Sequence, residues 1–167
     1  AFVAAATSRV RLHFNALIPP YRNPFLLAIA YRVKIPEDNQ RIVVRGHVAD
    51  DELHALYCGA SVFAFPSLAE GFGFPPLEAM ACGCPVVAST AASLPEVCGP
   101  AALSVDPRDI DSIANGLLSV LSDDGLRARL VAAGRKRVGE LTWTRCAEAH
   151  MAVFGAIAGR AGALIGG

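Results

Sequence analysis

The chain has little charge, and what it has is balanced. Only 18% of its 167 residues are charged, and 15 Lys and Arg offset 15 Asp and Glu, so the formal net charge is zero. Nucleic-acid-binding surfaces and polybasic membrane-binding surfaces both need an excess of positive charge. We therefore expect no nucleic-acid partner.

Long apolar runs and targeting segments are also lacking. The longest apolar stretches, such as residues 25–31, fall far short of the roughly 18 residues that span a bilayer. The start of the chain has no charged segment followed by an apolar core and a cleavage site, so we expect no signal peptide. The 53% hydrophobic content argues against disorder. These features predict a soluble, unusually apolar domain in the cytoplasm.

The cysteines are few and odd in number. Without a secretory signal, five cysteines predict reduced thiols rather than disulfides. The C-x-C pair Cys82 and Cys84 could form half of a soft metal site, but no second Cys or His pair at zinc spacing follows. We therefore interpret the cysteines as small buried apolar side chains and expect no metal ligand. His13, His47 and His54 are likewise interpreted as structural.

Short apolar segments alternate with helical patterns along the chain. The predicted strands are brief and lack clear alternation, as expected when both faces are covered, and comprise residues 10–14, 42–44, 62–65, 86–88 and 102–105. Predicted helices run from 50 to about 58, from 75–76, from 109, from 123 to about 138 and from about 142. This order predicts an α/β fold, a Rossmann-like parallel sheet with helices on both faces.

Local signals refine this outline. Asp50 is a predicted helix cap, and Ser93 with Glu96 reads as a capping box. The helix from 109 places four apolar residues on one predicted buried face, namely Ile110, Ile113, Leu117 and Leu121. Residues 1–158 are expected to form one domain, followed by a flexible Ala/Gly tail at 159–167.

The segment with the strongest chemical signal lies at residues 66–88. A predicted strand ends, a glycine loop follows and a helix opens, and ligands of open parallel sheets bind at such strand ends. Gly71 and Gly73 let the backbone approach a ligand. The N–H groups of Gly73 and Phe74, with the helix N-terminus, favour a phosphate.

Glu70 and Glu78 bracket this loop. Carboxylates repel phosphate but accept hydrogen bonds from vicinal hydroxyls, so the predicted ligand carries sugar hydroxyls, then a diphosphate, then ribose hydroxyls. On spacing alone, a solvated strand-to-helix turn with two exposed acids explains the pattern equally well.

The segment from Glu70 to Glu78, continuing to residue 88, resembles the E-x7-E signature of retaining glycosyltransferases of family 4, which adopt the GT-B fold. Flanking segments are similar to the same family, and the likeness extends over about residues 41–155. It rests on residues 41–48, 50–60, 93–103, 105–107 and 141–143. The resemblance implies the C-terminal, nucleotide-sugar-binding half of a GT-B enzyme, which transfers a hexose from a nucleotide diphosphate-sugar without a metal or other cofactor.

The resemblance also implies roles for single residues. Glu70 would be the catalytic-site acid that accepts bonds from the donor sugar, and Glu78 would hold the ribose. The implied donor site comprises Glu70, Gly71, Phe72, Gly73, Phe74, Glu78 and Val48, the last near the base. Glu96 matches a frequent family acid, but its predicted capping role explains it adequately.

Two registers are open for residues 1–40. In one, Arg22 belongs to a degenerate diphosphate-binding loop, which requires that a strand and a helix be deleted before Arg41. In the other, residues 10–14 are the family's second strand, and the first strand with its Arg/Lys loop is missing. The second register needs no deletion and is preferred.

The family's N-terminal acceptor domain has no counterpart in either register. We expect a donor half-site that is inactive alone, with membrane association only through the absent half. The alternative is a non-catalytic split or decayed domain that binds a partner chain. A related epimerase or phosphorylase is disfavoured by the Pro-Pro-Leu-Glu-Ala-Met-Ala segment that follows the loop.

Overall fold

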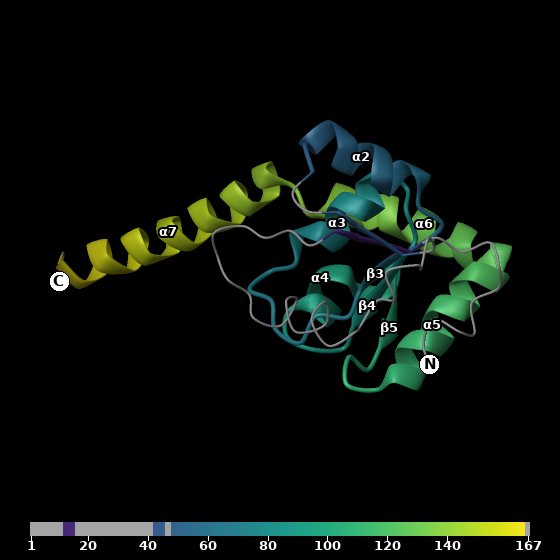
Figure 1. Cartoon of the computed structure of the whole chain (residues 1–167). Helices are drawn as coiled ribbons and strands as arrows, with labels where there is room; N and C mark the ends of the chain where they lie inside the picture. The colour runs from purple at the N-terminus through teal and green to yellow at the C-terminus, as the bar shows by residue number, and fades with distance from the viewer. Residues whose placement is uncertain (1–11, 16–41, 46–47, 166–167) are drawn as a thin grey trace.

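The computed structural model describes residues 12–15, 42–45 and 48–165, and side chains over residues 48–158. The strands are β1 (Leu12–Asn15), β2 (Ile42–Arg45), β3 (Phe63–Phe65), β4 (Val86–Ser89) and β5 (Ala102–Val105). The helices are α2 (Asp50–Gly59), α3 (Phe74–Ala81), α4 (Leu94–Cys98), α5 (Ile110–Ser122), α6 (Asp124–Glu140) and α7 (Trp143–Ile165), with a 3₁₀ turn at Gly99–Ala101 (Figure 1).

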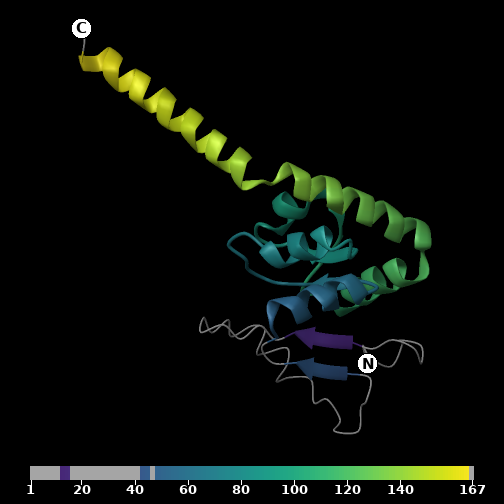
Figure 2. The same ribbon diagram turned by 90° about the horizontal axis from the view of Figure 1, so that it is seen from above.

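All described strand pairs are parallel, as the alternation of strands and helices predicts. β4 is the central strand of a three-stranded sheet, in the order β3-β4-β5. β1 and β2 form a separate pair, with Leu12 opposite Ile42 (Figure 2). Within the described residues no strand pairing joins the two sheets.

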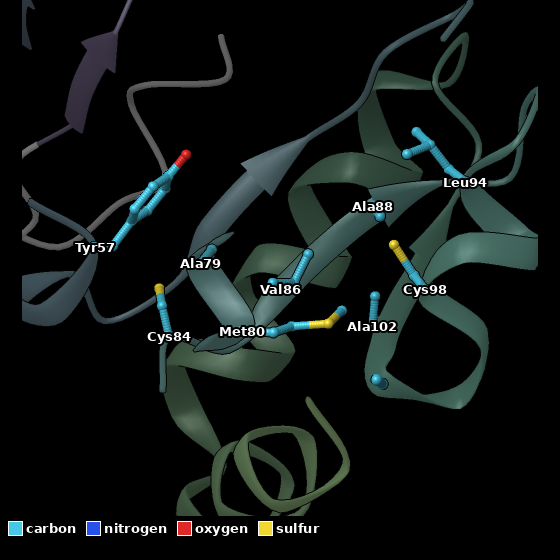
Figure 3. Packing of buried hydrophobic residues seen from close by; sticks show 10 residues of the cluster. Tyr57, Ala79, Met80, Cys84, Val86, Ala88, Leu94, Cys98 and Ala102 are labelled. Atoms are coloured by element: carbon cyan, nitrogen blue, oxygen red, sulfur yellow. The ribbon is translucent and has the colours of Figure 1, made fainter. Parts of the chain in front are cut away.

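Helices cover both faces of the three-stranded sheet. Val86 and Ala88 of β4 face a core built with Met80 of α3 and Leu94 of α4 (Figure 3). Val87, between them in sequence, faces the second core with side chains from α5 and α6. All four residues of β4 are buried, which explains why residues 86–88 form a continuous apolar run rather than an alternating pattern.

α5 lies close against the sheet. A Cβ atom on Gly116 would come 2.5 Å from Cγ1 of Val105, so this close approach requires glycine. Val120 of α5 is completely buried, whereas Ile110 is 65% exposed. The predicted apolar face is therefore correct for Ile113 and Leu117 and wrong for Ile110, since the first turn extends beyond the sheet.

Helix caps differ from their prediction in two places. Ala49, not Asp50, is the cap of α2, and Asp50 lies in the first turn. Ser93 precedes α4 with helical backbone angles and no capping hydrogen bond, so the predicted capping box with Glu96 is wrong. Asp109 and Asp123 do cap their helices, because their side chains accept hydrogen bonds from Asp111 N and Leu126 N.

The cysteines do not share one environment. Cys84 and Cys98 are buried, as expected for small apolar side chains, whereas Cys82 is half-buried and Cys58 and Cys146 are exposed. The buried-thiol interpretation is therefore wrong for Cys58 and Cys146, whose side chains are exposed.

α7 leads away from the rest of the described chain in both views (Figures 1 and 2). Its helical backbone continues to Ile165, into the segment at 159–167 that the sequence assigns to a tail. Within the described residues, no helix is both long enough and apolar enough to cross a membrane.

Candidate functional site

The glycine loop between β3 and α3 turns at Gly73. Gly73 caps α3 with φ 104° and ψ 56°, a left-handed conformation that residues with a side chain rarely adopt. A Cβ atom there would also come 2.6 Å from Cδ2 of Leu94. Gly71, in contrast, has open space around its Cα. Of the two glycines in the loop, only Gly73 is required by the backbone.

The start of α3 presents few backbone donors, and of the two residues that carry them Phe74 is exposed and Gly73 is buried. Pro75 and Pro76 occupy its first turn, as the sequence predicts, and carry no N–H. The N–H groups of Gly73 and Phe74 donate to no partner among the described residues. They therefore remain available, at the positive end of the helix dipole, for an anionic ligand.

Glu70 is half-buried, and two serines organise the backbone around it. Ser67 Oγ donates to Glu70 Oε1 over 2.8 Å. Ser93 Oγ lies 2.7 Å from the carbonyl oxygen of Phe72 and 3.2 Å from that of Glu70. The Ser93 hydroxyl thus connects the loop after β4 to the glycine loop after β3. Ser93 makes these contacts instead of the predicted helix-capping hydrogen bond.

Glu78 lies on the exposed side of α3, and Tyr57 of α2 reaches it. Tyr57 Oη donates to Glu78 Oε2 over 3.3 Å. Burial raises the pKa of Tyr57, and the Glu78 carboxylate raises it further, so the phenol stays protonated and remains a donor. One carboxylate oxygen of Glu78 is thereby oriented, and the other stays available for a ligand.

Aromatic rings flank the loop. Phe72 and Phe74 are 40% and 50% exposed, with ring centroids 4.7 Å apart. The Trp143 ring at the start of α7 lies 6.2 Å from Phe74. Exposed aromatic faces beside free N–H groups form a surface suited to a ligand that carries both apolar and anionic parts.

Not every predicted site residue joins this cluster. Val48 is buried just before α2, outside the helix itself. No described contact brings it to the glycine loop. Gly46, His47, Arg22 and the registers proposed for residues 1–40 lie outside the described residues, apart from β1.

Three residues of the site were missed by sequence reasoning. Tyr57 and Ser67 carry no motif of their own, although Tyr57 belongs to the flanking segment at 50–60. Ser93 was noticed, but its local spacing from Glu96 suggested the wrong partner.

A shallow hollow near Ser61, Arg127 and Arg135 lies at the amino ends of β3 and β4, at the opposite edge from the glycine loop.

The arrangement can hold a ligand with hydroxyls at two ends and an anion between them. Glu70 and Glu78 are acceptors on either side of the α3 N-terminus, and the fold brings them to the carboxyl edge of the parallel sheet. The family model "Glycosyl transferases group 1" matches residues 33–137. The chain belongs to the group 1 glycosyl transferases.

A relative with a curated name is also a glycosyltransferase. The chain is 46% identical over 101 residues to O-antigen chain mannosyltransferase B of Escherichia coli. The aligned region covers 60% of this chain and 26% of that protein. The chain thus spans about a quarter of that relative's length.

Solved structures similar to the group 1 domain are GT-B glycosyltransferases, which confirms the predicted fold class. Sucrose-phosphate synthase from Thermosynechococcus elongatus matches with TM-score 0.71 and 29% identity, over 87% of this chain and 39% of that one. Anabaena HepE, solved with UDP-glucose, matches with TM-score 0.68 and 21% identity, over 83% and 38%.

Proposed function

We propose that the chain is the donor-binding half of a retaining glycosyltransferase of family 4, which moves a hexose from a nucleotide diphosphate-sugar to an acceptor. The observation that carries the proposal is the left-handed Gly73 cap, which places Glu70 before the α3 N-terminus and Glu78 one turn into the helix. The mannosyltransferase relative and the UDP-glucose bound to Anabaena HepE support this class of donor.

Each group in the site has a proposed task. Glu70, the proposed catalytic-site residue, accepts hydrogen bonds from hydroxyls of the donor sugar. Glu78, oriented by Tyr57, holds the ribose hydroxyls. The N–H groups of Gly73 and Phe74 bind the diphosphate, while Gly71 and Phe72 shape the approach to the sugar. Val48, just before α2, is proposed to lie near the base.

Departure of the diphosphate develops negative charge, which the enzyme has to stabilise in the transition state. The N-terminus of α3 supplies part of that stabilisation. Arg and Lys residues of a preceding loop supply the rest, so the reaction as proposed uses neither a catalytic metal nor another cofactor.

An N-terminal acceptor domain completes the enzyme in this proposal, and the chain alone is inactive. The separate pairing of β1 with β2 supports the register in which β1 is the family's second strand, because a first strand would then fit between β1 and β3. We place the enzyme in the cytoplasm, with any peripheral membrane association made through the acceptor half.

The test is donor binding by the full-length protein. Calorimetric titration with a panel of nucleotide-sugars should identify a donor, and Glu70→Ala and Glu78→Ala should each weaken its binding by about 10- to 100-fold, the range for a lost hydrogen bond to a charged group. Asp111→Ala removes an exposed acid on α5 and serves as the control. Unchanged donor binding in both glutamate variants would show that the assignment is wrong.

A second candidate is a non-catalytic domain that binds a partner chain. The exposed apolar residues of α7, among them Met151, Phe154 and Ile157, favour it. The two candidates differ in the same titration, since a decayed domain retains partner binding but shows no heat with any nucleotide-sugar.

A further inference from the structure

Three soft metal ligands meet where α2 packs against the end of α3. His54 and Cys58 are four residues apart on α2, so they share one face of that helix. Cys82 is the C-cap residue of α3. One ligand atom from each of the three residues lies within 4.8 Å of the others.

The distances within this cluster match those of a bound metal. His54 Nδ1 lies 3.2 Å from Sγ of Cys82 and 3.9 Å from Sγ of Cys58. In a tetrahedral zinc centre, with Zn–N of about 2.0–2.1 Å and Zn–S of about 2.3 Å, a nitrogen and a sulfur ligand are roughly 3.6 Å apart. The two Nδ1 separations bracket that value, and the two sulfur atoms lie within 4.8 Å of each other. Cys58 Sγ also lies 3.7 Å from His54 Nε2, so a cation that contacts all three residues through Nδ1 requires a rotamer adjustment at Cys58.

We propose that His54, Cys58 and Cys82 form a binding site for a soft divalent cation, Zn²⁺ or its analogue Co²⁺, with water as the fourth ligand. One imidazole and two thiolates are the donor set that zinc prefers, and the exposure of His54 and Cys58 gives the ion an entry path.

The bound ion would fasten α2 to α3. Cys82 lies one turn after Glu78 in α3, and Tyr57, next to Cys58 in α2, already contacts Glu78. The cation therefore strengthens the connection between the same two helices, at the end of α3 opposite the glycine loop. It takes no part in the proposed sugar transfer, and the inference does not depend on that function.

The chain contains a matched control. Cys146 and His150 on α7 are also four residues apart, with Sγ and Nδ1 separated by 3.7 Å, and both are exposed. No third Cys, His, Asp or Glu completes a group there among the described residues. α7 thus carries a His/Cys pair alone, whereas α2 and the end of α3 together carry a set of three ligands.

The test is a Co²⁺ titration of the reduced, full-length chain, followed by optical absorption. One equivalent of Co²⁺ should produce thiolate-to-cobalt charge-transfer bands and the visible bands of tetrahedral Co²⁺, and Zn²⁺ should remove both by displacing it. His54→Ala, Cys58→Ser and Cys82→Ser should each weaken binding by about tenfold or more. Cys146→Ser should bind Co²⁺ like the wild type.

A second measurement guards against misfolded variants. Circular dichroism should show the same helix content in all four variants, and Zn²⁺ should raise the Tm of the wild type and of Cys146→Ser only. Absent charge-transfer bands in the wild type would overturn the proposal. So would binding that survives Cys82→Ser, or binding that is lost equally in Cys146→Ser.

Discussion

Gly73 is the residue on which the geometry of the candidate site depends most. It adopts a left-handed conformation at the turn from the glycine loop into α3, and Leu94 closes the space beside its Cα. The equally conspicuous Gly71 has neither constraint. Substitution of the two glycines should therefore have different effects on stability, although the sequence suggested one role for both.

Gly73→Ala should lower the free energy of unfolding by roughly 1–3 kcal/mol, because an alanine is strained at φ 104° and its Cβ collides with Leu94. Gly71→Ala, the matched control, should change it by less than about 0.5 kcal/mol. Urea unfolding of both variants measures the difference. Equal losses in the two variants would contradict the constraint at Gly73.

The buried thiols should be inert, and the exposed ones reactive. Burial raises the pKa of Cys84 from about 9 to about 12 and that of Cys98 to about 11. In the native chain at pH 8, iodoacetamide should therefore modify Cys58 and Cys146 and spare Cys84 and Cys98, as mass spectrometry can show. Modification of all five at one rate would mean that the cores are open.

The same shifts predict how stability depends on pH. Because Cys84 and Cys98 lose their protons at a higher pH when folded than when unfolded, the unfolded state releases protons first. The free energy of unfolding should be constant with respect to these groups below about pH 8. It should then fall as the pH rises past about 9, which urea unfolding at several pH values would measure.

Single residues were predictable from the sequence only where the motif itself contains them. Glu70, Gly73 and Glu78 stand in one short segment, and the structure places them around one turn. Tyr57 and Ser93 act across distances of 21 residues, through bonds to Glu78 and Phe72. Such contacts follow from which strands are neighbours, and no local spacing reports that.

Among the elements, α6 shows how one helix can stabilise the end of another. Arg137 of α6 donates from Nε to the carbonyl of Val97 over 2.9 Å and from Nη2 to that of Glu96 over 2.7 Å. These carbonyls belong to the short α4, whose C-terminal end favours a nearby cation. The guanidinium also pairs with Glu140 on its own helix.

Arg137→Ala should lower the free energy of unfolding by about 1–3 kcal/mol, because the partly buried Val97 carbonyl and the exposed Glu96 carbonyl of α4 would lose charged donors. Lys136→Ala, which removes the exposed cation next to it, should cost less than about 0.5 kcal/mol. Thermal unfolding of the two variants separates the cases. A similar Tm for both would show that the contact contributes little.

Element types were predictable because their signals are local. Prolines mark the start of α3, aspartates cap α5 and α6, and short, mainly apolar segments mark β4 and β5. The capping box at Ser93 failed because a hydroxyl binds whichever backbone group the fold brings nearest. The first turn of α5 failed because periodicity identifies a face but not the length over which the face is covered.

For the molecule as a whole, the start of α7 is brought beside the glycine loop. Trp143 is 79% exposed, and its ring lies 6.2 Å from that of Phe74, a residue 69 positions earlier. The sequence predicted a parallel α/β fold, but it could not predict this contact, because the contact depends on three-dimensional packing.

Trp143 is the only tryptophan in the chain, so its fluorescence reports on this contact. The chain alone should show a red-shifted emission that iodide quenches readily, since the ring is open to solvent. Phe74→Ala should increase the quenching further, whereas Leu118→Ala, which removes an exposed apolar side chain on α5, should not. A blue-shifted emission that iodide does not quench would contradict the described position of α7.

The central position of β4 also determines how slowly its amide hydrogens exchange with solvent. Its backbone pairs with a strand on each side, and its four side chains are sealed between two cores. Local fluctuations at loops or at α7 leave those amides closed, so they open only when the entire sheet comes apart. Exchange of the β4 amide hydrogens should therefore report global unfolding, whereas amides in the exposed part of α7 should exchange through local opening.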